Sequence, residues 1–132
     1  MKPIQIGKIN IQKLIDEDKS GLPYTEVFSK ADWTIFASNA SWLGHQIDFE
    51  TQHIYMSFHS YVVRTERSTI LVGACLGNDK ERGGTLPFHM RDGDFLGRLG
   101  ALGLGPADID YVMCTHMHAD HVGWNTRLEN GR

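Results

Sequence analysis

A short apolar run, Asp110–Cys114, leads directly into a cluster of metal-binding side chains. The run is bounded by turn-forming residues, so we predict a strand there. Side chains two positions apart on an extended backbone face the same side, which brings His116 and His118 together. A helix that begins near Asp120 would direct Asp120 and His121 toward a second position. The four side chains His116, His118, Asp120 and His121 are therefore the candidate metal ligands.

The donor atoms of this cluster favour particular metals. Three imidazoles and one carboxylate suit Zn, Fe, Mn or Ni better than Ca or Mg, which prefer oxygen donors. The chain has seven histidines, so a chance pair is easily found. Three histidines and an aspartate at this spacing, directly after a strand, are much harder to obtain by chance. The pattern therefore predicts a metal centre.

This pattern resembles the metallo-β-lactamase superfamily, in which a His-x-His-x-Asp-His motif follows a short apolar strand. The upstream sequence is also similar: Leu102–Asp110 looks like the helix end and turn before that strand, and Ser60–Val63 with Thr69–Val72 looks like the early hairpin. The resemblance is good from residue 54 onward and loose over the first fifty residues. Residues 58–125 look most like the lactonase and organophosphate-hydrolase branch.

The resemblance implies an α/β fold, as the N-terminal half of an αββα sandwich. We expect residues 1–132 to be part of a single metallo-hydrolase domain, with 1–50 as a wrapping segment and 54–132 as the half-sandwich that carries the metal motif. Members of the superfamily are longer than this chain, and their second half normally supplies the remaining metal ligands. We therefore expect a C-terminal half or a second chain to complete the site, and a homodimer is one such arrangement.

The implied function is hydrolysis. Two divalent ions, most suitably Zn with Fe, Mn or Ni as alternatives, would generate a hydroxide that cleaves a lactone, ester or phosphotriester. Asp120 would be the catalytic residue that carries a proton to the leaving group. The substrate would be a small molecule. The alternative is a catalytically inert half-domain or fragment that acts only with a partner segment.

Composition narrows the classes of partner and the cellular locations that remain. The net charge is −3 with acidic and basic residues interspersed, so no basic stripe indicates a nucleic-acid partner. No apolar run is long enough to cross a membrane, and the first residues lack the apolar region of a signal peptide, which favours a cytoplasmic location. Two cysteines, Cys75 and Cys114, do not form a disulfide framework, and both are expected to be buried. A position for Cys114 near the metals is the alternative.

Other patterns predict local structure. Ile4, Ile6, Ile9 and Ile11 alternate with a phase shift at Gly7-Lys8, which indicates an edge strand with a bulge. Phe95, Leu99 and Leu102 fall on one helical face, and Gly103 suits its C-terminal cap. Ser29 or Asp32 is expected to cap a short helix. The aromatic residues between positions 12 and 50 are expected to cover the sandwich, with a substrate pocket as the alternative.

Three further expectations concern the neighbourhood of the metal centre. Relatives often carry a supporting Asp where this chain has Gly73. Such carboxylates orient metal-bound histidines, so the absence of one here would weaken the site. The basic residues Arg64, Lys80 and Arg82 are expected to be solvated, with an acidic substrate as the alternative. A half-sandwich leaves one apolar sheet face uncovered, and the candidate positions near it are Ile70, Val72, Tyr111 and Met113.

Overall fold

The structure is a computed structural model that describes residues 2–83 and 88–130. The chain divides into two compact units: unit 1 contains Met1–Asp16 and Phe58–Arg132, and unit 2 contains Glu17–Ser57. In chain order the elements are β1 (Ile4–Ile6), β2 (Ile9–Pro23), α1 (Tyr24–Val27), α2 (Trp33–Ser38), α3 (Ala40–Leu43), η1 (Gly44–Gln46), β3 (Ile47–Asp48), β4 (His53–Arg64), β5 (Thr69–Val72), α4 (Phe95–Ala101), η2 (Pro106–Asp108), β6 (Tyr111–Met113), α5 (Ala119–Val122) and η3 (Gly123–Asn125). The sheet order is β1-β2-β4-β5-β6, with β3 paired to β4. Over the described ranges, no helix is long and apolar enough to span a membrane.

Residues 4–11 form a hairpin, so the prediction of one edge strand with a bulge is wrong. Strands β1 and β2 pair antiparallel with Ile6 opposite Ile9, which leaves only Gly7 and Lys8 as the turn. Gly7 has a φ of +57°, a conformation that two-residue hairpin turns require and glycine adopts at little cost. The phase shift in the isoleucine pattern therefore marks a change of strand direction.

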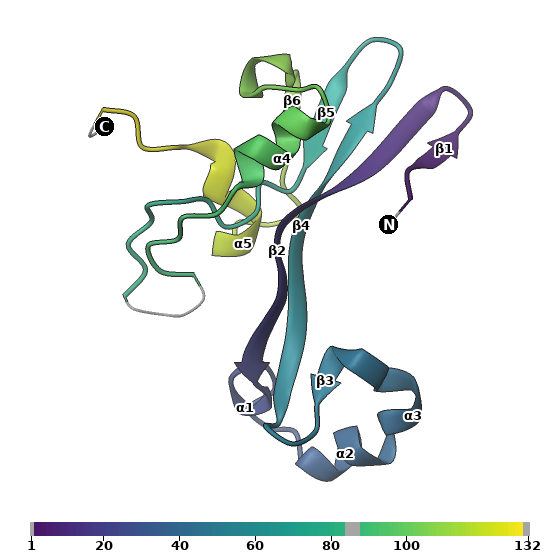
Figure 1. Cartoon of the computed structure of the whole chain (residues 1–132), viewed down its shortest axis with the longest axis vertical. Helices are drawn as coiled ribbons and strands as arrows, with labels where there is room; N and C mark the ends of the chain where they lie inside the picture. The colour runs from purple at the N-terminus through teal and green to yellow at the C-terminus, as the bar shows by residue number, and fades with distance from the viewer. Residues whose placement is uncertain (1, 84–87, 131–132) are drawn as a thin grey trace. The chain divides into compact units, whose positions relative to one another are not determined.

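The predicted hairpin and the following strand are both confirmed. Strands β4 and β5 pair antiparallel, with Arg64 opposite Thr69. Strand β6 pairs parallel with β5, and α4 belongs to the crossover between them. Figure 1 shows α4 lying across β5 and β6. Because β5 and β6 are parallel, the loops that follow them leave the same edge of the sheet.

Helix α4 packs one face onto this sheet. Phe95 and Leu99 are 1% and 2% exposed and belong to a core that includes Val62 and Leu71. Burying each such side chain contributes about 1.5–3 kcal/mol. The helix ends as predicted at Gly103, whose φ is +72° and whose N–H donates to the carbonyl of Gly100. The N–H of Leu104 donates to Leu99, which completes a Schellman cap.

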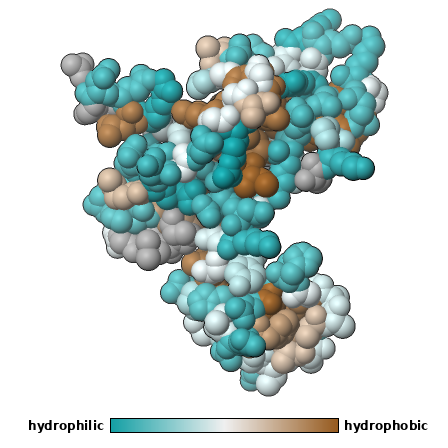
Figure 2. All heavy atoms as spheres, in the orientation of Figure 1, coloured by the Kyte–Doolittle hydropathy of each residue, from teal (hydrophilic) through white to brown (hydrophobic). Residues whose placement is uncertain are grey.

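The opposite face of the same strands is apolar and only partly covered. Directly opposed residues share a face, so the pairs Tyr61–Val72 and Val72–Met113 place these side chains together. A groove of about 400 Å³ on this side is lined by Ile4, Ile11, Tyr61, Val63 and Val72. Within β5 only Leu71 is buried, while Ile70 and Val72 are partly exposed. Figure 2 shows hydrophobic side chains reaching the surface among hydrophilic ones.

Unit 2 has its own aromatic cluster. Trp33 and Phe36 lie 5.3 Å apart between ring centroids, and each also contacts Tyr24. Phe49 packs on Trp33. As predicted, Asp32 caps α2: its carboxylate accepts a bond from the N–H of Thr34 at 2.8 Å, which lowers the pKa of Asp32. These aromatic side chains pack on one another, while Trp42 is 71% exposed.

Candidate metal centre

The ligand cluster lies where the parallel strands β5 and β6 end. Strand β6 ends at Met113, and the loop after it carries Thr115, His116 and His118 before α5 begins at Ala119. The loop after β5 runs beside it, because the N–H of Gly73 donates to the carbonyl of Met113 at 2.9 Å. Both loops leave the sheet at one edge, which brings their residues together.

Four side chains converge in this loop. Donor atoms of His116, His118 and Asp120 all lie within 4.8 Å of one another. The imidazole centroids of His116 and His118 are 4.6 Å apart, so the two rings lie together on this loop, whose backbone bends at positions 115, 116 and 118. His121 joins the group, with its ring centroid 4.0 Å from that of His116 and its Nε2 3.2 Å from Oδ2 of Asp120.

The carboxylate of Asp120 occupies a central place in this arrangement. It belongs to the three-residue donor group and also lies 3.2 Å from Nε2 of His121, so it is close to all three histidines. Its side chain is 28% exposed, whereas His116 and His118 are classed as exposed. Imidazole and carboxylate donors at these separations fit a divalent ion of the zinc type. The chemistry of the donor set thus agrees with the predicted metals.

Thr115 is a contributor that the motif did not reveal. Its hydroxyl lies 3.0 Å from Nδ1 of His116 and 3.4 Å from Nδ1 of His121. A partner on one imidazole nitrogen fixes the ring orientation and leaves the other nitrogen for a ligand. The signal available in the sequence was a hydroxyl residue directly before the first histidine.

A backbone ladder holds α5 against the loop after β5. The N–H of Ala74 donates to the carbonyl of His121, and the N–H groups of Gly123 and Trp124 donate to Cys75 and Ala74, at 2.7–2.8 Å. These bonds run on both sides of the ligand His121. A helix of four residues is too short to be stable alone, so these bonds account for its place.

Gly73 and Cys114 both lie beside His121. A Cβ on Gly73 would lie 4.0 Å from Nδ1 of His121, and Gly73 has a φ of +77°. Position 73 therefore faces the imidazole that a carboxylate there would support. The thiol of Cys114 donates to the carbonyl of His121 at 3.2 Å and is only partly buried, while Cys75 is buried as expected. Cys114 thus contacts the backbone of a ligand, and it is outside the donor group found among the described residues.

The three basic residues near the loops bind backbone carbonyls, so the expectation that they are solvated is wrong. Arg64 donates to Leu102, and Lys80 donates to the carbonyl and hydroxyl of Thr126 at 3.0 and 2.7 Å. Arg82 donates to Leu76 and Phe88. Burial and then the nearby Arg91 lower the pKa of Arg82, while Asp120 and Asp16 oppose that shift. Charged side chains serve here as links between loops.

The other histidines have separate partners. Nε2 of His59 lies 3.3 Å from the hydroxyl of Tyr61, as suits a structural histidine. Nδ1 of His89 accepts the N–H of Arg82 at 3.1 Å. Nδ1 of His53 lies 2.8 Å from the carbonyl of Thr51. Within residues 2–83 and 88–130, the group that could hold an ion contains none of them.

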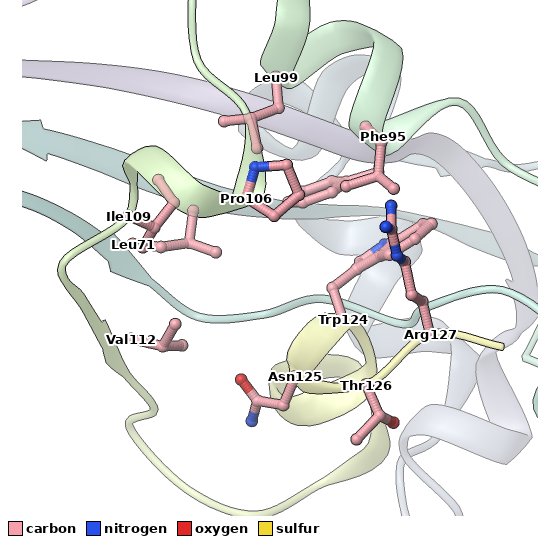
Figure 3. A pocket seen from close by; sticks show the side chains of 11 residues that line it. Leu71, Phe95, Leu99, Pro106, Ile109, Val112, Trp124, Asn125, Thr126 and Arg127 are labelled. Carbon is pink, nitrogen blue, oxygen red and sulfur yellow. The ribbon is translucent and has the colours of Figure 1, made fainter. Parts of the chain in front are cut away.

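A pocket of about 290 Å³ lies on the α4 side of the sheet. Phe95, Leu99, Val112 and Trp124 line it, and Figure 3 shows side chains of α4, β5, β6 and η3 surrounding the space. Phe95 and Trp124 stack with centroids 5.2 Å apart. The four candidate ligands are not among the residues that line this pocket, so it is separate from the metal centre.

Solved structures of similar fold include a probable metal-dependent hydrolase, a dizinc lactonase and a hydrolase. A probable metal-dependent hydrolase from Staphylococcus aureus is 25% identical with a TM-score of 0.72, and the match covers 94% of this chain and 43% of that one. AidC, a dizinc quorum-quenching lactonase, is 21% identical with a TM-score of 0.69, covering 96% and 39%. The hydrolase AbOPH is 21% identical with a TM-score of 0.56, covering 91% and 37%.

This chain therefore spans about two fifths of the length of these structures, as expected for part of a metallo-β-lactamase fold. This likeness of fold confirms the predicted α/β class and the predicted half-sandwich. No curated protein sequence matches the chain significantly. The family model of the metallo-beta-lactamase superfamily matches residues 59–131, which is more than half of the sequence and includes the whole ligand cluster. The chain belongs to the metallo-beta-lactamase superfamily.

Proposed function

We propose that this chain carries the metal-binding half-site of a dinuclear metal-dependent hydrolase. The observation that supports the proposal is the convergence of His116, His118 and Asp120 within 4.8 Å at the carboxyl edge of parallel strands, with His121 beside them. In this proposal His116 and His118 hold one ion, and Asp120 and His121 hold the other. Zinc suits these donors best, and Fe, Mn or Ni would also fit.

When bound, the ions would supply a Lewis acid and a hydroxide nucleophile near neutral pH. Asp120 would hold the proton and pass it to the leaving oxygen, since its carboxylate lies among the donor atoms of the three histidines. Thr115 would keep the His116 ring oriented through its contact with Nδ1.

We propose a lactone, an ester or a phosphotriester as the substrate class. The support is the likeness of fold to a dizinc lactonase and to the hydrolase AbOPH. All three substrates present an oxygen for a Lewis acid and an electrophilic centre for hydroxide. The walls that would choose among them are not identified by the residues of the metal loop.

The site requires ligands beyond the four residues named. A catalytic zinc takes at least three protein ligands, and the proposed assignment gives two to each ion. We propose that a further polypeptide segment, or a second copy of this chain, covers the apolar sheet face and supplies them. Tyr111 and Met113 are 60% and 58% exposed on that side, and exposed apolar surface of this kind marks an interface.

The alternative is an inert half-domain that acts only with a partner. Metal uptake separates the two, because an active half-site should bind metal and an inert one should not. Inductively coupled plasma mass spectrometry on the dialysed complete protein, with the covering segment or second copy in place, should find zinc bound in the wild type and a large loss in the His116→Ala/His118→Ala variant. His45→Ala is the matched control, since His45 is exposed and lies in unit 2. A complete wild-type protein without metal, or a variant that retains it, contradicts the proposal.

Sedimentation tests the covered face. An uncovered apolar sheet should drive the isolated chain to associate, so analytical ultracentrifugation should show dimers or larger species at high concentration. Replacing Tyr111 and Met113 by Lys should reduce that association, because charged side chains on this face oppose its burial. A wild-type chain that stays monomeric at high concentration contradicts the proposed covering.

A further inference from the structure

One arginine links the metal loop to the rest of unit 1. Arg82 lies between β5 and α4, and its guanidinium donates to the carbonyls of Phe88 at 3.0 Å, Leu76 at 2.7 Å and Ala119 at 3.4 Å. The backbone N–H of Arg82 donates to Nδ1 of His89 at 3.1 Å. Three separate segments of backbone therefore meet at one side chain.

The carbonyl of Ala119 is the informative contact. Ala119 is the first residue of α5 and stands between the candidate ligands His118 and Asp120. The helix has four residues and no side-chain cap, so its own hydrogen bonds cannot fix its conformation. Whatever holds the Ala119 peptide also sets the direction in which the two neighbouring ligands point.

The other end of this link is firmly held. The N–H of Leu76 donates to Oδ2 of Asp16 at 3.0 Å, while the Leu76 carbonyl accepts from Arg82. Asp16 is 2% exposed, and its other oxygen lies 3.7 Å from Nη2 of Arg91, whose side chain is 8% exposed. Arg82 thus joins the metal loop to a buried, charge-paired anchor.

The chemistry of the arginine side chain suits this arrangement. A guanidinium is planar and offers five N–H donors in fixed directions, so it can reach several carbonyls at once. An ammonium is a compact charge with three donors on a flexible stem, and it cannot reproduce that geometry.

We propose that Arg82 is a positioning residue for the metal centre, which locks the Ala119 peptide against Leu76 and Phe88 and so presets His118 and Asp120 for metal binding. The metal-binding consequence rests on the proposed function, but the locking of the loop does not. This role differs from the recognition of an acidic substrate, because the guanidinium is directed at backbone carbonyls.

The test compares Arg82→Met and Arg82→Lys with a matched control, Arg98→Met. Arg98 also donates to two backbone carbonyls of unit 1, those of Ile15 and Asp16 at 3.1 and 3.3 Å, and both acceptors lie outside the metal loop. Hydrogen exchange on the metal-free chain should show amides of residues 119–124 exchanging on the order of tenfold faster in both Arg82 variants. Amides of β4 and β5 serve as the internal reference for global stability.

Cobalt titration then measures how each variant changes metal binding. The ligand-field spectrum of Co(II) should change in the Arg82 variants, and affinity should fall roughly 10–100-fold, as for other groups that support metal ligands. Arg98→Met should keep the wild-type spectrum and affinity. The Co(II) spectrum and the Co(II) affinity both report the local geometry of the site. A general loss of stability would not change them in the Arg82 variants alone.

Each outcome decides the proposal. Wild-type exchange at residues 119–124 in Arg82→Met, or full retention of exchange and affinity in Arg82→Lys, overturns it. If Arg82→Met does not fold, Arg82→Lys and the β4–β5 reference still give the comparison. A complete protein that binds no cobalt overturns the proposed function, while the exchange measurement still decides whether Arg82 holds the loop.

Discussion

The Cα of Gly123 lies so close to Leu76 that a Cβ built on Gly123 would stand 1.8 Å from the Leu76 carbonyl oxygen. The reverse approach is also tight, because a Cβ on Gly77 would lie 2.6 Å from the Gly123 carbonyl. Two loops that are far apart in sequence therefore meet backbone to backbone directly after the ligand His121. Only glycine permits this approach.

Gly123→Ala should accordingly displace the metal loop. The added methyl group would meet backbone, which cannot move aside. We therefore expect the free energy of unfolding to fall by roughly 1–3 kcal/mol or more, as at other overpacked sites. Chemical denaturation measures it, and metal affinity should fall in parallel. Gly105→Ala is the control, because its Cβ would make an ordinary contact of 3.6 Å with Asp108. Equal stability of the two variants would contradict the close approach.

Asp120→Asn should reduce catalysis far more than folding. The amide keeps the shape of the carboxylate but cannot carry a proton, so turnover of a lactone or ester by the complete protein should fall by about 10²–10⁴-fold. The side chain is 28% exposed and outside the core, so the melting temperature should change little. Asp92→Asn, an exposed position, serves as the comparison. Undiminished turnover with metals still bound would remove Asp120 from the mechanism.

Gly73→Asp should strengthen metal binding relative to Gly73→Asn. The two side chains have the same shape, and both must adopt a φ of +77°, which costs on the order of 1 kcal/mol. Only the carboxylate can support the His121 imidazole, whose Nδ1 would lie 4.0 Å from the new Cβ. Competition with a chelator should give a metal affinity at least roughly tenfold higher for the Asp variant. Equal affinities would show that position 73 does not support the site.

Stability should fall at high pH through Cys75. Burial raises the pKa of Cys75 from 9.0 to about 12, while the thiol of the unfolded chain keeps its ordinary value. The folded state therefore retains a proton that the unfolded state releases. Stability is fully present below about pH 9 and declines toward pH 12, with a slope that approaches about 1.4 kcal/mol per pH unit.

Cys75→Ala isolates this contribution from the titration of lysines and tyrosines. Urea midpoints at several pH values between 8 and 11, roughly the window set by this linkage, should fall more steeply for the wild type than for the variant. Iodoacetamide at neutral pH should label Cys75 only after unfolding, because the thiolate is the reactive form. Parallel pH dependence in both proteins would contradict the raised pKa.

Local sequence patterns determined much of unit 1. The alternation in Ser60–Val63 and Thr69–Val72 predicted the β4–β5 hairpin, and the spacing of Phe95 and Leu99 predicted α4 with its glycine cap. The position of His116 and His118 on an extended backbone followed from its period of two. These features depend on residues that are neighbours along the chain, so the sequence is sufficient to reveal them.

The hairpin at Gly7-Lys8 was missed because a bulge and a reversal give the same shift in an alternating pattern. The roles of Arg82 and Gly123 were missed for a different reason. Arg82 is 37 residues from Ala119, and Gly123 is 47 residues from Leu76. Composition and spacing do not record which distant backbones approach each other, since that depends on how the sheet, α4 and the two loops pack. The candidate ligands were therefore identified from the sequence alone, whereas the contacts that Arg82 and Gly123 make with the loops were decided only by the tertiary structure.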